Sequence, residues 1–312
     1  MSDTATDTGD TLAGPAAAPM ETRAVRLRNF WWDFRQSWVA VVSLVVIVTL
    51  LALSFGAPVV APQDPYDIAM LDWLDAFLPP GTVGTGGYVH VLGTDNAGRD
   101  MLSAIFYGLR TSFTIGLSAG ALALTIGVTI GLTAAYFGGR IESLLMRIVD
   151  LQLSMPAILL ALVMVAVLGQ GAMQIIIALV FAQYAYFART THGAATVERG
   201  KDYIEAARST PLPTRRVLFR HLLPNVMPPL IVVATVQVAS AIALEATLSF
   251  LGVGLPLTEP SLGSLISNGF RYIHSDRFWL SIYPGIFLMI TVVAINLVGD
   301  QVRTVLAPRH GR

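Results

Sequence analysis

Six apolar stretches of about 20 residues each constrain this chain more than any other feature of its sequence. About 30 Å of hydrocarbon is crossed by about 20 residues of α-helix, because each residue advances the helix by about 1.5 Å. The first stretch, residues 38–55, contains twelve Leu, Ile, Val or Phe residues and no charged residue. Only 13% of the whole chain is charged, about half the share of a typical soluble domain. The sequence therefore predicts an all-α integral membrane protein with six transmembrane helices.

The predicted spans divide the chain into membrane segments and aqueous segments. The spans are expected at residues 38–55, 113–137, 151–168, 173–188, 229–251 and 278–298. The other segments are expected to be a disordered tail at 1–20, an interfacial amphipathic helix at 21–37, loops at 56–112, 189–228 and 252–277, and a tail at 301–312. Residues 113–300 form the predicted core of the protein.

Lysine and arginine residues set the predicted orientation. With the N-terminus in the cytoplasm, sixteen of these residues fall on the inside and four on the outside. Basic residues near the ends of spans are enriched on the cytoplasmic side, so this distribution predicts cytoplasmic N- and C-termini. The loops 56–112 and 252–277 are then extracytoplasmic, whereas the loop 189–228 lies in the cytoplasm.

Glycines recur at a four-residue spacing at two places in the second predicted span. They are Gly116, Gly120, Gly127 and Gly131. Small residues at this spacing let two helix backbones approach closely, and lipid supplies no hydrophobic drive for helix association. These positions are therefore predicted to form a helix-packing face. The stretch 116–120 also matches the G-x-S-x-G pattern of serine hydrolases, but that pattern needs an exposed serine at a strand-to-helix turn.

No catalytic residue and no metal site is expected in this chain. It has no cysteine, and no histidine lies within a predicted span to activate a serine. The five histidines lack the i, i+4 spacing of two ligands on one helix face. The only lysine, Lys201, follows a glycine, but the upstream glycine and the following Ser/Thr of a phosphate-binding loop are missing. The chain is therefore not expected to hydrolyse ATP by that route.

The most distinctive polar stretch lies in the loop 189–228. Glu205, followed by two alanines, precedes His221 by sixteen residues. A first short helix is predicted at about 203–209, and a second from about 212 or 214 to 223. Prolines at 224, 228 and 229 are predicted to break the chain before the fifth span. A solvated basic loop that merely enforces topology explains the charges but not this spacing.

The spacing resembles the EAA loop of ATP-binding-cassette (ABC) importer permeases. Four further stretches carry the resemblance, at residues 90–100, 107–112, 245–252 and 296–303. Together they make the chain similar to the dipeptide/oligopeptide/nickel ABC transporter permease family, and to its second, C-type subunit. The resemblance extends from about residue 23 to 309 and implies a type I ABC importer permease fold.

The resemblance implies that this chain is the membrane-spanning part of a larger importer. Its implied partners are a second, homologous permease, two ATP-binding-cassette ATPases, an extracytoplasmic substrate-binding protein and the lipid bilayer, with no nucleic acid. ATP and magnesium would be bound by the ATPases, so no cofactor and no enzyme activity is expected here. The implied location is the bacterial cytoplasmic membrane, and the implied cargo is a di- or oligopeptide. Nickel or another small solute is the nearer alternative, and a stand-alone channel or an intramembrane enzyme is the remoter one.

In that family the EAA loop docks into a groove on the ATPase. The resemblance assigns this coupling role to Glu205, Ala206, Ala207, Arg208, Pro211, Arg215, Arg216, His221, Pro224 and Asn225. The family usually has a glycine where this chain has Pro211. Proline has a fixed φ and no N–H, so the bend between the two short helices is predicted to differ.

Glu245 is the one carboxylate well inside a predicted span. Ionisable residues inside a membrane are costly and commonly functional. We expect Glu245 to line an outer vestibule or to pair across the interface with the second permease. A structural acid that is either paired or snorkelling to the interface is the alternative.

Overall fold

The protein is described by a computed structural model that covers residues 23–67, 71–209, 213–256 and 259–306. The predicted tail 1–20 and Pro211 lie outside these residues, as does the end of the predicted tail 301–312. Five helical runs within the described residues are long and apolar enough to cross a membrane. They are α2 (Trp38–Phe55), α4 (Met101–Phe137), α7 (Ala172–Arg199), α12 (Trp279–Leu306) and the run Thr214–Phe250, which ends in α10 (Leu223–Phe250).

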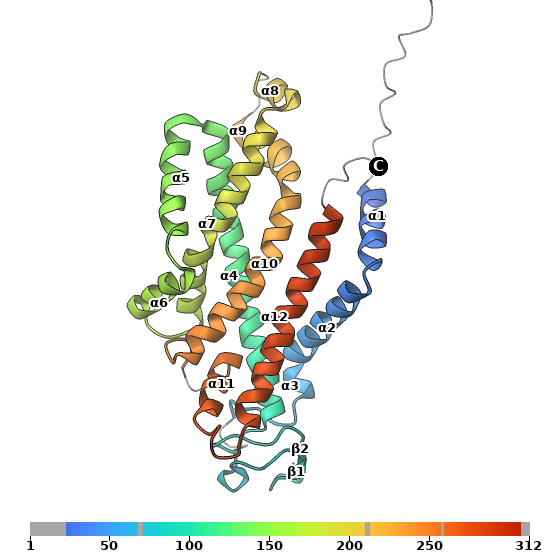
Figure 1. Ribbon diagram of the computed structural model, residues 1–312, viewed down its shortest axis with the longest axis vertical. Helices are drawn as coiled ribbons and strands as arrows, with labels where there is room; N and C mark the ends of the chain where they lie inside the picture. The colour runs from blue at the N-terminus through green and yellow to red at the C-terminus, as the bar shows by residue number, and fades with distance from the viewer. Residues whose placement is uncertain (1–22, 68–70, 210–212, 257–258, 307–312) are drawn as a thin grey trace, which may run out of the picture.

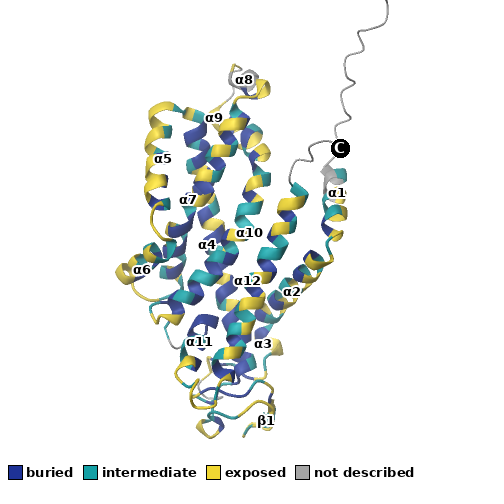
Figure 2. Cartoon of the chain, in the orientation of Figure 1, coloured by how far each residue is buried: buried dark blue, intermediate teal, exposed yellow. Residues whose placement is uncertain are grey.

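The long helices form one bundle with α4 at its centre (Figure 1). α4 packs against α7 along much of its length and also contacts α2, α10 and α12. Figure 2 shows the buried residues gathered in the middle of this bundle and the exposed residues on its outer faces. The exposed face of α2 is apolar and includes Val42, Val45 and Val48. A continuous apolar outer face is what contact with lipid tails requires.

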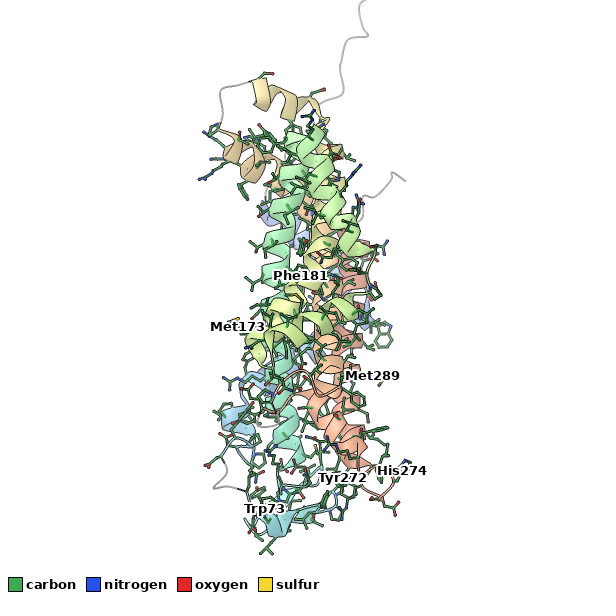
Figure 3. All side chains as sticks on the ribbon, turned by 90° about the vertical axis from the view of Figure 1, so that its left-hand side faces the viewer. Trp73, Met173, Phe181, Tyr272, His274 and Met289 are labelled. Atoms are coloured by element: carbon green, nitrogen blue, oxygen red, sulfur yellow. The ribbon has the colours of Figure 1, made fainter. Side chains whose placement is uncertain are left out.

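The two ends of the bundle carry different segments (Figure 1). One end, which we call the α8 end, has the end of α12 and two shorter helices, α1 (Arg23–Arg35) and α8 (Asp202–Ser209). The opposite end, which we call the hairpin end, has α3 (Ala57–Val60), η2 (Trp73–Asp75), the paired strands β1 (Thr82–Val83) and β2 (Val89–His90), and α11 (Leu262–Phe270). Figure 3 places Trp73, Tyr272 and His274 at the hairpin end, far from α8. Segments that are predicted to lie on the same side of the membrane are therefore found at the same end of the bundle.

Three of the long helices extend beyond the predicted spans. α4 begins at Met101 rather than near residue 113, while α7 continues to Arg199 and α12 to Leu306. The early start of α4 follows from Asp100, whose side chain accepts a hydrogen bond of 2.8 Å from the Ser103 N–H as the N-cap. These extensions carry polar residues out of the apolar layer, so a hydropathy pattern alone does not reveal them.

The third predicted span, residues 151–168, is not one straight helix. Instead, α5 (Gly139–Leu153) and α6 (Ala157–Leu168) meet at an angle of 92°. Pro156 sits at the break, because proline has no N–H for the helix ladder and disfavours helical geometry in the residue before it. α6 has 12 residues, or about 18 Å of helix, which is too short to cross a bilayer alone. Counting the bent pair as one broken span brings the total to six.

The second short helix of the loop 189–228 runs directly into the fifth predicted span. α9 (Thr214–Arg216), the π-helical turn η3 (Val217–Leu222) and α10 follow one another without a gap, so the predicted break at the prolines is wrong. Proline lacks an N–H and crowds the carbonyl four residues back. The wider π turn accommodates Pro224, because the Leu223 N–H donates to the carbonyl of Leu218, five residues back. The prolines at 228 and 229 lie inside α10, and membrane helices tolerate such positions where neighbouring groups satisfy the freed carbonyls.

The four glycines of the predicted packing face lie where α4 approaches two other helices. Gly116 and Gly120 face α10, and Gly127 and Gly131 face α7. A Cβ atom added at Gly131 would lie 2.5 Å from the backbone carbonyl oxygen of Ala188. Real Cβ atoms essentially never come within 3.0 Å of a neighbouring heavy atom, so this approach of backbones requires glycine.

The variant Gly131→Leu is expected to destabilise the bundle by at least about 1–3 kcal/mol, the usual cost of overpacking a core. The added side chain would meet backbone of α7, which cannot rotate away as a flexible side chain can. Thermal unfolding of the detergent-solubilised protein measures the effect. Gly193→Leu is the matched control, because a Cβ at this position of α7 meets nothing within 4 Å. Equal melting temperatures for the two variants would contradict the packing assignment.

Candidate functional site

α8 stands out from the α8 end of the bundle, beyond the long helices (Figure 1). The short helix predicted at about 203–209 is present as Asp202–Ser209. Its backbone contains four residues with a predicted coupling role, Glu205, Ala206, Ala207 and Arg208. The side chains of these four residues, like Pro211, lie outside the described part of the protein. The structure thus describes the backbone of this helix, the residues before it and those from Pro213 onward.

Ile204 fixes α8 to the bundle by an apolar contact. Its side chain is fully buried in a cluster that includes Leu132 of α4, Ala195 of α7, Leu222 of η3 and Val226 of α10. This cluster draws residues from four other helical elements, although α8 itself lies at the outer end of the molecule. Burying a side chain of this size stabilises the docked position of α8 by about 1.5–3 kcal/mol.

A chain of hydrogen bonds adds a directional link beside this contact. The Asn225 Nδ2 of α10 donates to the Tyr203 hydroxyl of α8 at 2.9 Å, and also to the carbonyl of His221 at 2.8 Å. The Tyr203 hydroxyl in turn donates to Oε1 of Glu198 near the end of α7. The Lys201 Nζ lies 2.6 Å from the other oxygen of the same carboxylate. The network therefore joins α7, α8 and α10.

The protonation state of Tyr203 suits its place in this network. Burial, together with the hydrogen bond to Glu198 and the charge of that carboxylate, raises the pKa of Tyr203 from 10.0 to about 12. The hydroxyl therefore stays protonated at physiological pH and keeps its proton to donate. A phenolate beside Glu198 would instead be repelled by the like charge.

Positive charge is exposed next to α8. Arg215 and Arg216 of α9 and Arg220 of η3 are all exposed. Within the described residues, none of the three forms an ion pair. Pro224 is exposed as well, whereas His221 is half-buried. Exposed guanidinium groups of this kind are suited to carboxylates on a partner surface.

The helices beneath α8 are tied to each other. Arg199 of α7 donates from Nη1 to the carbonyl of Ala135 in α4 at 2.5 Å. His192 of α7 and Glu142 of α5 share a hydrogen bond of 2.7 Å between Nε2 and Oε1. Arg189 of α7 also forms an ion pair with an aspartate of α5. The helices next to α8 are therefore joined to one another by hydrogen bonds and ion pairs, so α8 does not depend on a single isolated helix end.

Glu245 lies inside the chain and not on its surface. Its side chain, in α10, is 0% exposed. Its Oε2 accepts a hydrogen bond of 2.7 Å from the hydroxyl of Ser112 in α4, and its Oε1 accepts one of 2.8 Å from Ser249. In this structure the carboxylate is therefore enclosed by residues of its own chain. Of the predicted alternatives, the paired structural acid matches this geometry.

Comparison with known proteins identifies the family. Residues 127–312 match the family described as binding-protein-dependent transport system inner membrane component. The chain belongs to this family. Residues 26–80 match the N-terminal TM domain of oligopeptide transport permease C, so the predicted resemblance to this group of permeases is confirmed. This inner membrane component is thus a multi-pass membrane protein of a transporter and not an enzyme.

Two relatives align with this inner membrane component over nearly its whole length. The di/tripeptide transport system permease protein DppC of Pseudomonas aeruginosa (strain UCBPP-PA14) is 36% identical over 95% of this chain and 96% of its own. The dipeptide transport system permease protein DppC of Escherichia coli (strain K12) is 38% identical over 91% of this chain and 93% of its own.

A solved structure shares the fold at low sequence identity. It is the MetNI methionine ABC transporter in an inward-facing conformation, with a TM-score of 0.53 and 22% identity. The match covers 66% of this chain and 97% of that chain. The predicted all-α fold of a type I ABC importer permease is confirmed by this likeness.

Sequence reasoning missed three residues that position α8, namely Glu198, Tyr203 and Ile204. One signal was available, because Ile204 is a large aliphatic residue between polar neighbours in a polar loop. The link between Tyr203 and Asn225 left no such signal, since the two residues are 22 positions apart. Only the folded arrangement of α7, α8 and α10 brings them together.

Proposed function

We propose that this chain is the C-type permease subunit of an ATP-driven importer of short peptides. It forms the pathway with a homologous permease and receives its solute from an extracytoplasmic binding protein. Two ATPases, which hold ATP and magnesium, drive the transport. The observation that carries the proposal is the alignment over more than nine-tenths of the chain with relatives named as di/tripeptide and dipeptide permeases.

In this proposal the α8 end faces the cytoplasm and the hairpin end faces the binding protein. The excess of lysine and arginine in the segments gathered at the α8 end supports this orientation. α8 is the ATPase-docking element, with Glu205, Ala206, Ala207 and Arg208 on it. Its support is its place beyond the bundle, its anchor at Ile204, and the three exposed arginines at 215, 216 and 220 beside it.

The continuous run from α9 to α10 gives the docked ATPases a mechanical path into the membrane. A displacement of the loop's second helix is carried into α10 because no flexible break separates them. α10 packs against α4, α7, α11 and α12, so its movement reaches most of the bundle. ATP binding by the partners can thereby change the conformation of the pathway.

Solute uptake tests the peptide assignment. The gene is deleted in the source organism, and uptake of radiolabelled alanyl-alanine is compared with uptake of radioactive nickel in the deletion strain and in the complemented strain. Loss of dipeptide uptake alone, restored by the complementing gene, is the expected result. Loss of nickel uptake alone would assign the metal alternative. ATP-independent uptake by the purified chain would instead indicate a stand-alone channel.

Glu205→Lys is expected to weaken ATPase docking while leaving membrane insertion intact. The change reverses the charge of a residue on α8, the helix proposed to enter the ATPase groove. Co-purification of ATPase with the tagged chain, together with dipeptide uptake, measures the effect. Glu205→Gln serves as the control, since it keeps the size of the side chain. If Glu205→Lys leaves both co-purification and uptake unchanged, this residue has no coupling role.

A further inference from the structure

We propose that Tyr203 and Asn225 form a positioning pair that makes α8 move as one body with α10 and with the end of α7. The inference rests on the proposed role of α8 as the ATPase-docking element. It goes beyond that role, because it names the contact through which displacement of α8 reaches the membrane helices. Its basis is the hydrogen bond of 2.9 Å from Asn225 Nδ2 to the Tyr203 hydroxyl, and its continuation to Glu198.

The donors and acceptors in this contact are matched atom by atom. The Asn225 amide nitrogen has two hydrogens, and both have acceptors, the Tyr203 oxygen and the carbonyl of His221. The phenol has one hydrogen, which it donates to Glu198, and its oxygen is free to accept from Asn225. The carboxylate of Glu198 accepts from Tyr203 at Oε1, and its Oε2 lies 2.6 Å from the Lys201 ammonium, which favours the ionised form. Each group therefore holds the next in one orientation.

Ile204 and Tyr203 have different mechanical roles. The apolar contact of Ile204 holds α8 close to the bundle, but apolar contacts are not directional and leave the helix free to turn about this anchor. The hydrogen bonds of Tyr203 depend on angle as well as distance, so they fix that rotation. If α8 could rotate about a single anchor, a displacement imposed by the ATPase would be lost in that rotation. If its orientation is fixed, the same displacement is transmitted to the membrane helices.

The covalent route from α8 to α10 is longer than the route through the hydrogen bond. Along the chain, Tyr203 and Asn225 are 22 residues apart. Through the hydrogen bond they are in direct contact, just where α10 begins and close to the π turn that ends at Leu222. Through this pair, a displacement of α8 therefore reaches the first turn of α10 directly, without passing along the intervening loop.

The exposure of the pair argues for positioning rather than for stability. Asn225 is exposed and Tyr203 is 40% exposed, so water competes for both partners. Removing the hydroxyl leaves the buried anchor at Ile204 in place. The pair should therefore affect how much transport each ATP hydrolysed supports, with little effect on folding or on ATPase binding.

The test uses Tyr203→Phe in the whole complex, purified through a tag on this chain and reconstituted in proteoliposomes. Uptake of radiolabelled alanyl-alanine and hydrolysis of ATP are measured together, with the binding protein added. The expected result is unchanged ATPase content and a fall of about fivefold to tenfold in dipeptide imported per ATP hydrolysed. Tyr283→Phe is the control, because within the described residues the Tyr283 hydroxyl makes no hydrogen bond.

Asn225→Leu and the double variant decide whether the two residues act through one contact. If they do, the double variant is no worse than the worse of the two single variants, because each change already removes the bond that they share. Multiplying losses would overturn the proposal, as would a Tyr203→Phe complex that imports as efficiently as the wild type. Loss of bound ATPase in Tyr203→Phe would also overturn it, because the pair would then build the docking surface. If the wild-type chain itself binds no ATPase, the proposed function fails first.

Discussion

Replacing Glu245 with alanine is expected to prevent most of the protein from accumulating in a folded state. The change removes the acceptor of two buried hydroxyls, those of Ser112 and Ser249, and leaves a void between α4 and α10. Each buried polar group left without a partner costs about 1–3 kcal/mol, and no water is available inside the bilayer to replace the carboxylate. The yield of monodisperse protein in detergent and its melting temperature measure the loss.

Glu245→Gln is the matched variant, because it keeps the length of the side chain and one oxygen to accept a hydrogen bond. It is expected to fold with a much smaller decrease in melting temperature. An alanine variant as stable as the wild type would contradict a structural role for the acid. A glutamine variant that folds and assembles but no longer imports dipeptide would show that the charge itself serves transport, as in the original expectation of a vestibule or interface residue.

Ile204→Asp is expected to detach α8 from the bundle and to abolish ATPase binding. The wild-type side chain is fully buried in an apolar cluster, and an unpaired carboxylate there costs several kcal/mol. Swinging α8 into water relieves that cost without unfolding the long helices, because α8 lies beyond their ends. ATPase recovered with the tagged chain should fall at least about tenfold, the effect of about 1.4 kcal/mol.

The control for this variant is Ile204→Leu, which keeps an apolar side chain of the same volume and should retain ATPase binding. The melting temperature of the chain without its partners separates detachment from unfolding. Detachment leaves that temperature near the wild-type value, because the remaining bundle is intact. Full ATPase binding by Ile204→Asp would contradict the anchoring role of this residue.

The sequence predicted the membrane class and most of the long helices because apolar length is a local property. Residues 38–55 show this most clearly, since the predicted span and α2 have the same bounds. The predicted glycine spacing also corresponds to a feature of the fold, because Gly116 and Gly131 both lie at close approaches of helices. The assignment to the family followed from short motifs, and this assignment did not depend on the exact ends of the spans.

The remaining features depend on contacts between distant residues. Pro156 bends the third span, whereas Pro228 and Pro229 lie inside a continuous helix. Proline thus breaks the helix at one position and is accommodated within a helix at the other. The surrounding turns and helices decide which of the two occurs. Glu245 was recognised as unusual, but its pairing with Ser112 spans 133 positions and could not be read from the sequence.

The membership of this chain in an ATP-driven importer is tested by purifying the tagged chain from its native membrane and identifying the proteins recovered with it by mass spectrometry. We expect a second, homologous permease and ATP-binding-cassette ATPases in the same complex, with the ATPases lost from the Ile204→Asp variant. Recovery of the wild-type chain alone, under conditions in which other ABC complexes stay intact, would show that it works without these partners.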